Sequence, residues 1–361
     1  MSDLREVFEM ATKEMKPDRD AWKEQERREV RRSRNRTAGA FLAVAILLIA
    51  ATVFAFSQMN DSSITPQAPD RSGTVIDHGR TPVVVGLDGT AMGTLHGLPA
   101  DARSLSESPD GRSVLFVADR DGTSQVGTVG IDGTGARFLT HVARGTVPEI
   151  SFPLTGALMP AWSPDGSQIA FTNGHIWVMQ ADGSNLRQLT RSDGVDLWPA
   201  WSPDGSTIAY SDSGTTTLDN SGFSPTQEIW TVPASGGSPT RVTRNAVPDD
   251  MPAFSPTGAE MAFFRDGHIW LMDTSGGNAH PLPGAPSRGA FVPRWSPHGA
   301  QLVFTTCCTR PRALDGGPVL YVHVFDIPTG RDTIIGKVES DIDSPQWVGS
   351  GNGLIENQYT G

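Results

Sequence analysis

Residues 161–171 read Ala-Trp-Ser-Pro-Asp-Gly-Ser-Gln-Ile-Ala-Phe, and residues 200–210 repeat them as Ala-Trp-Ser-Pro-Asp-Gly-Ser-Thr-Ile-Ala-Tyr. Further copies begin at Ala253 and Arg294, and a weaker copy covers residues 108–116. A Ser-Pro-x-Gly turn followed by a short apolar strand therefore recurs every 39 to 55 residues. A repeat of this length, filled with short strands, is typical of a β-propeller.

Each repeat contains the pattern of four antiparallel strands. After the strand that follows Ser-Pro-x-Gly comes a second apolar run, such as residues 176–179, and then a small turn at residues 181–183. A last strand ends in Leu-Thr, as at Leu189-Thr190. Proline suits the second position of the Ser-Pro-x-Gly turn, and glycine suits the position with positive φ. We expect the tryptophans to pack between neighbouring sheets.

Both ends of the repeat region hold half a unit. Residues 81–98 match a third and a fourth strand, and residues 345–355 match a first and a second strand. Joined together they make one composite blade, which closes the ring and removes most of its strand edges. The sequence therefore predicts an all-β fold, a propeller with five internal blades and a sixth composite blade.

The repeat resembles the WD-like propeller repeat of TolB-type proteins over residues 81–356. The resemblance implies the fold and leaves the activity open, because propellers serve many functions. TolB proper has an α/β domain before its propeller, for which this chain has no room, so a role in the Tol system is not implied. By arrangement alone, the N-terminal region also resembles membrane-anchored anti-sigma factors.

Residues 38–56 form an uncharged stretch of 19 residues, preceded by six arginines between Arg27 and Arg36. At about 1.5 Å per residue, such a helix crosses the hydrocarbon core of about 30 Å. The basic flank places the N-terminus in the cytoplasm. A cleaved signal peptide is the rival interpretation, but residues 1–36 are long for its charged region.

We therefore expect four parts and a single-pass protein of the cell membrane. They are a helical cytoplasmic tail (1–36), a transmembrane helix (37–57), a linker (58–73) and an extracytoplasmic propeller (74–361). In the tail, five apolar residues recur at helical spacing. These are Leu4, Val7, Phe8, Ala11 and Met15. They form either a docking helix for a cytoplasmic protein, or a helix on the inner leaflet, or a disordered lead-in to the anchor.

The charge and the motifs of the chain exclude several classes of ligand and of enzyme. The net charge is −11, although residues 1–36 hold 11 Lys and Arg against 9 Asp and Glu. The acidic propeller makes nucleic acid an unsuitable partner. The histidines show no metal-binding spacing, and we expect no cofactor. The chain contains no Gly-x-Ser-x-Gly elbow of an α/β-hydrolase.

The longer insertions are predicted to share one face of the propeller. They cover residues 141–159, 212–226, 283–292 and 306–318. Long loops on a rigid ring commonly carry binding, so we predict a ligand face there. Its candidate residues are Asp196, Asp249, Asp250, Asp343, Arg310 and Arg312. The aspartates could ring the central opening around a hard cation such as Ca²⁺, but the preferred interpretation is that each one caps a turn or a blade.

Cys307 and Cys308 are the only cysteines, and they are adjacent. Outside the cytoplasm they can form a vicinal disulfide. Adjacent strand residues point to opposite faces, however, so two reduced thiols are the expected state.

These features predict a membrane-anchored propeller that binds a protein or an envelope glycan and is not an enzyme. A transmembrane regulator whose tail binds a cytoplasmic partner is the first alternative. A propeller hydrolase or lyase is the second.

Overall fold

The computed structural model describes most of the second of two units in the chain, Met1–Met59 and Asn60–Gly361. The described residues are 81–86, 91–142, 156, 158–214, 224–286, 289–307, 319–339, 346–348 and 353–358. The predicted tail, membrane segment and linker lie outside these residues.

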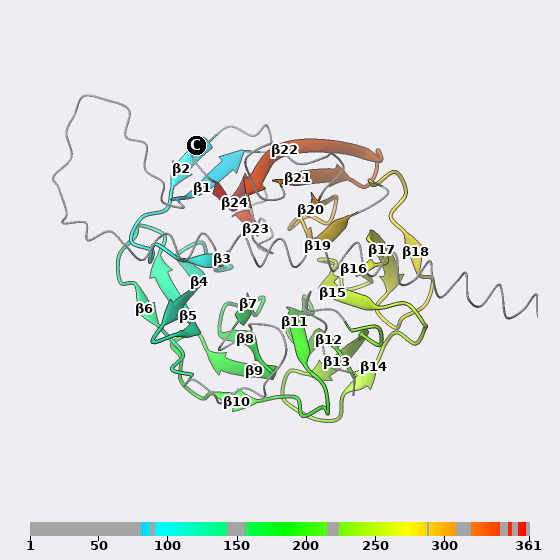
Figure 1. Cartoon of the computed structure of the whole chain (residues 1–361), viewed down its shortest axis with the longest axis horizontal. Helices are drawn as coiled ribbons and strands as arrows, with labels where there is room; N and C mark the ends of the chain where they lie inside the picture. The colour runs from blue at the N-terminus through cyan, green and yellow to red at the C-terminus, as the bar shows by residue number, and fades with distance from the viewer. Residues whose placement is uncertain are drawn as a thin grey trace, which may run out of the picture. The chain divides into compact units, whose positions relative to one another are not determined.

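The described strands form four-stranded antiparallel sheets placed around a ring (Figure 1). Five of these sheets consist of four consecutive strands, and we number them blades 1 to 5. Blade 1 contains β3 (Arg103–Glu107), β4 (Ser113–Arg120), β5 (Thr123–Gly130) and β6 (Arg137–Phe138). Blade 2 contains β7 (Leu158–Trp162), β8 (Gln168–Asn173), β9 (His175–Gln180) and β10 (Arg187–Gln188). Blade 3 contains β11 (Asp196–Trp201), β12 (Thr207–Asp212), β13 (Glu228–Pro233) and β14 (Thr240–Arg241).

The same order of strands continues to the end of the ring. Blade 4 contains β15 (Asp249–Phe254), β16 (Glu260–Arg265), β17 (His268–Asp273) and β18 (His280–Pro281). Blade 5 contains β19 (Ala290–Trp295), β20 (Gln301–Cys307), β21 (Val319–Asp326) and β22 (Arg331–Glu339). In each blade the first strand lies nearest the centre of the ring (Figure 1).

A composite sheet joins the two ends of the propeller. It contains β1 (Thr81–Gly86), β2 (Ala91–Thr94), β23 (Gln346–Val348) and β24 (Gly353–Gln358), in the order β2-β1-β24-β23. β1 pairs with β24 along its whole length. The sheet contacts blade 1 through β3 and blade 5 through β22. It therefore lies between the first and the last of the continuous blades.

The predicted fold class needs one correction. The structure has five blades of consecutive strands, not six, because the remaining sheet takes two strands from each end of the propeller. The predicted helices lie outside the described residues, which are all strand, turn or irregular structure. In that part of the chain, no helix is long and apolar enough to cross a membrane.

Alternate connections of an antiparallel blade lie on opposite faces of the ring. The turn face carries the first-to-second and third-to-fourth connections, including the five Ser-Pro-x-Gly turns. The loop face carries the second-to-third connections and the links between blades. Three connections on the loop face are long, and they run between β6 and β7, between β12 and β13, and between β20 and β21.

Side-chain hydrogen bonds organise the turns of the turn face. In blade 2, Ser163 Oγ donates to Asp165 Oδ1 at 2.6 Å, and the Ser167 amide donates to the same oxygen at 3.0 Å. Gly166 has φ of +70°, and a Cβ at this position would lie 3.5 Å from Pro109 of the preceding turn. That distance is an ordinary van der Waals contact, so the positive φ is the reason for glycine in this turn.

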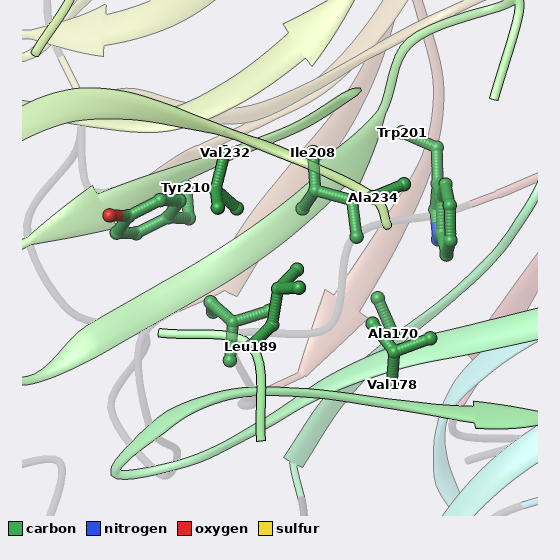
Figure 2. Close-up of a cluster of buried hydrophobic side chains, with 9 residues drawn as sticks. Ala170, Val178, Leu189, Trp201, Ile208, Tyr210, Val232 and Ala234 are labelled. Atoms are coloured by element: carbon green, nitrogen blue, oxygen red, sulfur yellow. The ribbon is translucent and has the colours of Figure 1, made fainter. Parts of the chain in front are cut away.

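The hydrophobic core consists of layers between neighbouring sheets. One layer joins blade 2 with blade 3, and Figure 2 shows its side chains facing one another across the two sheets. Its buried members are Ala170, Ile176, Val178, Leu189, Trp201, Ile208, Tyr210, Val232 and Ala234. Because every blade buries both of its faces in such layers, apolar burial stabilises the ring as one body.

Indole hydrogen bonds connect the innermost strands across these layers. Trp201 Nε1 donates to the Ala161 carbonyl at 3.1 Å, and Trp347 Nε1 donates to the Arg294 carbonyl at 3.2 Å. Trp162 and Trp295 make the same bond to Ser106 and Ala253. The prediction that tryptophans pack between sheets is confirmed, and each of these indoles also holds the backbone of a neighbouring sheet.

Candidate functional site

Each innermost strand of the five continuous blades contains a bulge at the same place. The strand register shifts there, and one non-glycine residue takes a positive φ between 52° and 57°. These residues are Ser104, Met159, Trp198, Met251 and Val292. A bulge bends a strand and redirects its side chains, and such strain persists only where the surroundings impose it. In blades 2 to 5 a proline follows the strained residue, as Pro199 follows Trp198.

Asp196 begins β11, on the loop-face side of the bulge, and its side chain is fully buried. Its carboxylate accepts hydrogen bonds from Thr190 Oγ1 at 2.5 Å and from Ser192 Oγ at 3.0 Å. His175 Nδ1 lies 3.1 Å from the same carboxylate. These three partners come from blade 2 and the link that follows it. Asp196 thus caps the contact between blades 2 and 3.

Asp249 and Asp250 begin β15 and are also buried. Arg265 binds Asp249 with two hydrogen bonds, of 2.5 Å and 2.7 Å, and Asn245 adds a third of 2.7 Å. Asp250 lies against Ser211 of blade 3, and no cationic group of the described residues contacts it. Burial, together with the charge of Asp249, raises the pKa of Asp250 to about 6.

Equivalent cross-strand pairs at the loop-face end differ in charge from blade to blade. The pairs are Asp196–Asp212 in blade 3, Asp249–Arg265 in blade 4 and Ala290–Thr306 in blade 5. The pair in blade 4 is an ion pair, whereas the pair in blade 3 opposes two carboxylates. Like charges directly opposite each other destabilise a sheet. Asp212 is therefore an exception to the pattern, and sequence reasoning did not select it.

Glu228 extends the carboxylates of blade 3 to a row of three. Asp212 lies opposite Asp196 on one side and opposite Glu228 on the other. The exposed fractions of Asp196, Asp212 and Glu228 are 0%, 7% and 3%. Burial, with the charge of Asp196, raises the pKa of Asp212 to about 6. Burial and these two aspartates also raise the pKa of Tyr210. We call Asp196, Asp212 and Glu228 the carboxylate row.

Arg294 is a second charged group on an innermost strand. It lies in β19 at the position that Ala161, Ala200 and Ala253 occupy in blades 2 to 4. Among the described residues, its guanidinium makes one hydrogen bond, to the Pro293 carbonyl at 3.0 Å, and no ion pair. Burial lowers the pKa of its guanidinium to about 10. A cation held in this way is costly unless an anion accompanies it.

Thr306, His323 and Asp332 form a hydroxyl–imidazole–carboxylate chain in blade 5. Thr306 Oγ1 lies 2.8 Å from His323 Nε2, and His323 Nδ1 lies 2.9 Å from Asp332 Oδ2. The order matches that of a nucleophile and its base. However, Thr306 and His323 are each 4% exposed, and the imidazole stacks on Phe304. The chain therefore acts as a buried hydrogen-bond network within the core.

The remaining predicted site residues are only partly described. Asp343, Arg310 and Arg312 of the ligand face lie outside the described residues, as do Leu4, Val7, Phe8, Ala11 and Met15 of the tail. Cys307 ends β20 and Cys308 lies beyond the described part, so the redox state of the pair stays a prediction. In the described part, no three His, Cys, Asp or Glu side chains are placed to hold a metal ion.

Known proteins are similar to this chain in sequence. The TolB beta propeller domain matches residues 138–268. A protein TolB homolog of Chlorobium luteolum is 28% identical over 175 residues, covering 46% of this chain and 35% of the relative. The chain thus spans about a third of the length of that curated relative.

Solved structures share the fold. The putative TolB of Agrobacterium tumefaciens superposes with a TM-score of 0.59 at 19% identity, covering 78% of this chain and 99% of the other. An oligogalacturonate lyase in complex with manganese gives a TM-score of 0.52 at 15% identity, covering 77% and 78%. The structure defines a β-propeller with four-stranded blades. Within that class, the chain is similar in sequence to TolB-type propellers over part of its length.

Proposed function

We propose that this chain is a protein-binding propeller and that its partner contacts the loop face. The observation that supports the proposal is the difference between the two faces. On the turn face of blades 1 to 5, every first-to-second connection is a short Ser-Pro-x-Gly turn. The loop face carries the three long connections, and the carboxylate row and the Asp249–Arg265 ion pair lie at the strand ends on the same face.

Rigid strand ends combined with long loops suit recognition of a large partner. The hydrogen bonds at the bulges and the ion pairs fix the strand ends. These ends therefore lose little further conformational entropy when a partner binds. The loops can vary without disturbing the sheets, because they leave the blade cores intact. Envelope glycans are the second ligand class for this face.

Replacement of one long connection tests the proposal. In the full chain, residues 213–227 between β12 and β13 are exchanged for a two-residue Asn-Gly turn, which suits a hairpin. Affinity purification followed by mass spectrometry then compares the partners of this variant with those of the unmodified chain. Loss of a partner supports the loop face as the binding surface, provided that circular dichroism shows an intact fold. An unchanged partner list overturns this assignment.

A lyase or hydrolase activity has weaker support. The carboxylate row contains an acid whose pKa lies near neutrality, which is a common property of catalytic groups. The exposed fraction of these three side chains is at most 7%, so they do not reach a substrate in this conformation.

The location of the propeller is a separate proposal. The uncharged residues 38–56 and the arginines before them support attachment to the cell membrane with the propeller outside. Protease treatment of intact spheroplasts tests this arrangement. Protection of the propeller from the protease would contradict it. A tail that binds a cytoplasmic protein is compatible with the same topology, and purification of a chain lacking residues 2–26 tests that alternative.

A further inference from the structure

Asp212 is the least compensated member of the carboxylate row. Asp196 has the hydroxyls of Thr190 and Ser192 and the imidazole of His175 as partners. Glu228 accepts bonds from Thr243 at 2.5 Å, Arg241 at 2.8 Å and the Asn245 amide at 2.9 Å. Among the described residues, Asp212 accepts one bond, of 2.7 Å, from the Gly214 amide. Within that part of the chain, no cation is bound to this third negative charge of the row.

The fold itself does not require an acid at this place. The equivalent residue is Arg265 in blade 4 and Thr306 in blade 5, and both blades keep the same strand pairing. An aspartate in blade 3 thus introduces an electrostatic cost that the neighbouring blades avoid. Such a cost is removed when the carboxyl group binds a proton.

We propose that Asp212 is a proton-operated switch in the contact between blades 2 and 3. When protonated, its carboxyl group lies between Asp196 and Glu228 without repulsion. When ionised, it repels both neighbours and loosens the loop-face ends of β12 and β13. These ends hold the connection formed by residues 213–227. This switch alters the stability of the loop-face end of blade 3, and it does not depend on which ligand the loop face binds.

The charged and titratable groups around Asp212 come from every strand packed against it. They are Asp196 of β11, Glu228 of β13, His175 of β9, Arg241 of β14 and Tyr210 of its own strand. His175 and Arg241 lower the pKa of Asp212, but burial and Asp196 outweigh them. Asp250 packs against the other face of the β12 backbone through Ser211, so it titrates as a separate group.

Hydrogen exchange measures the predicted loosening. A pKa near 6 in the closed state against 3.8 in the open state makes local opening about tenfold more favourable at pH 7 than at pH 5. Hydrogen exchange of the full chain, corrected for intrinsic rates, is followed at both pH values. We expect this increase in peptides covering residues 207–214 and 228–233 of the unmodified chain, and a clearly smaller increase in D212N, in which Asp250 still titrates near pH 6.

Two control variants separate Asp212 from other groups. D204N removes an exposed acid at the other end of the β11–β12 hairpin, and it should keep the full response. H175Q removes the imidazole, whose Nδ1 lies 3.1 Å from the Asp196 carboxylate. If H175Q abolishes the response while D212N keeps it, the switch belongs to His175 and the proposal is wrong. An identical response in the unmodified chain and in D212N also overturns it.

A second measurement covers the case in which D212N does not fold. Carbon NMR of the aspartate Cγ atoms is recorded against pH for the unmodified chain and for D250N, which removes the other aspartate expected to titrate near pH 6. One carboxyl group of D250N should still titrate near pH 6. If every remaining aspartate of D250N titrates below pH 5, the proposal is overturned.

Discussion

The indole Nε1 of Trp347 donates a 3.2 Å hydrogen bond to the backbone carbonyl of Arg294. This bond joins β23 of the composite sheet to β19 of blade 5, and it repeats the bond from Trp201 to Ala161 between blades 3 and 2. The ring is therefore closed by the same contact that connects its continuous blades. Phe254 occupies the corresponding position of blade 4, and its side chain has no N–H to donate.

Replacement of Trp347 by phenylalanine tests this closure. W347F keeps an aromatic ring but leaves the Arg294 carbonyl without its indole donor, so we expect the free energy of unfolding to fall by about 1 kcal/mol. W201F removes the equivalent bond between continuous blades and is the matched variant. Urea denaturation of both variants measures the effect. If only W201F is destabilised, the composite sheet does not close the ring in solution.

Asp250 should make stability depend on pH. Its pKa is raised in the folded state to about 6 from 3.8, so the folded state binds more protons than the unfolded state between these values. Its contribution is greatest below pH 4 and is lost as pH rises through 6. D250N should remove this loss and unfold at a higher urea concentration at pH 7. A steeper decline in D250N than in the unmodified chain would contradict the assignment.

Asp204 should behave in the opposite way. Hydrogen bonds from the Ser202 hydroxyl, then from the Ser206 amide and hydroxyl, lower its pKa to about 2. Its favourable contribution is therefore present above pH 4 and is lost as pH falls through 2. Carbon NMR of the aspartate Cγ atoms should show this group titrating well below the usual range. S202A removes the first donor and should return the midpoint toward 3.8; an unchanged midpoint would contradict the bonding.

Arg294 should reduce stability in the absence of a ligand. Its half-buried guanidinium lacks a carboxylate partner among the described residues, and a charge withdrawn from water without a partner is costly. R294M keeps most of the side-chain volume, and we expect it to raise the free energy of unfolding by about 1 kcal/mol. R241M is the control, because Arg241 binds Glu228 and its loss should destabilise the fold. A destabilised R294M would show that Arg294 has a structural partner.

Local sequence patterns predict the strands but not the charges that oppose one another. Ser-Pro-Asp-Gly, the apolar runs and Leu189-Thr190 each mark a turn or a strand by their own chemistry. They place Asp196 and Asp249 at the correct end of the innermost strands. They do not show that both side chains are buried, because burial depends on the neighbouring blade.

Asp212 could have been found by aligning the repeats. Asp212 follows Asp196 at the same distance as Arg265 follows Asp249 and Thr306 follows Ala290. That spacing predicts equivalent cross-strand pairs, and among these three pairs only Asp196 and Asp212 carry the same charge. The sequence also marks the strained residues before Pro199 and Pro252, because a proline within a strand pattern indicates a bulge. The pKa values depend on burial, which the sequence does not specify.

Site-specific photo-crosslinking tests the central claim, that a partner contacts the loop face. Val247, in the link between blades 3 and 4, is 38% exposed on the loop face, and Ile131, after β5, is 41% exposed on the turn face. A photoreactive phenylalanine derivative replaces each residue in turn in the full chain, and native membranes are irradiated. We expect a protein adduct from position 247 and none from position 131. An adduct from position 131 alone would contradict the account.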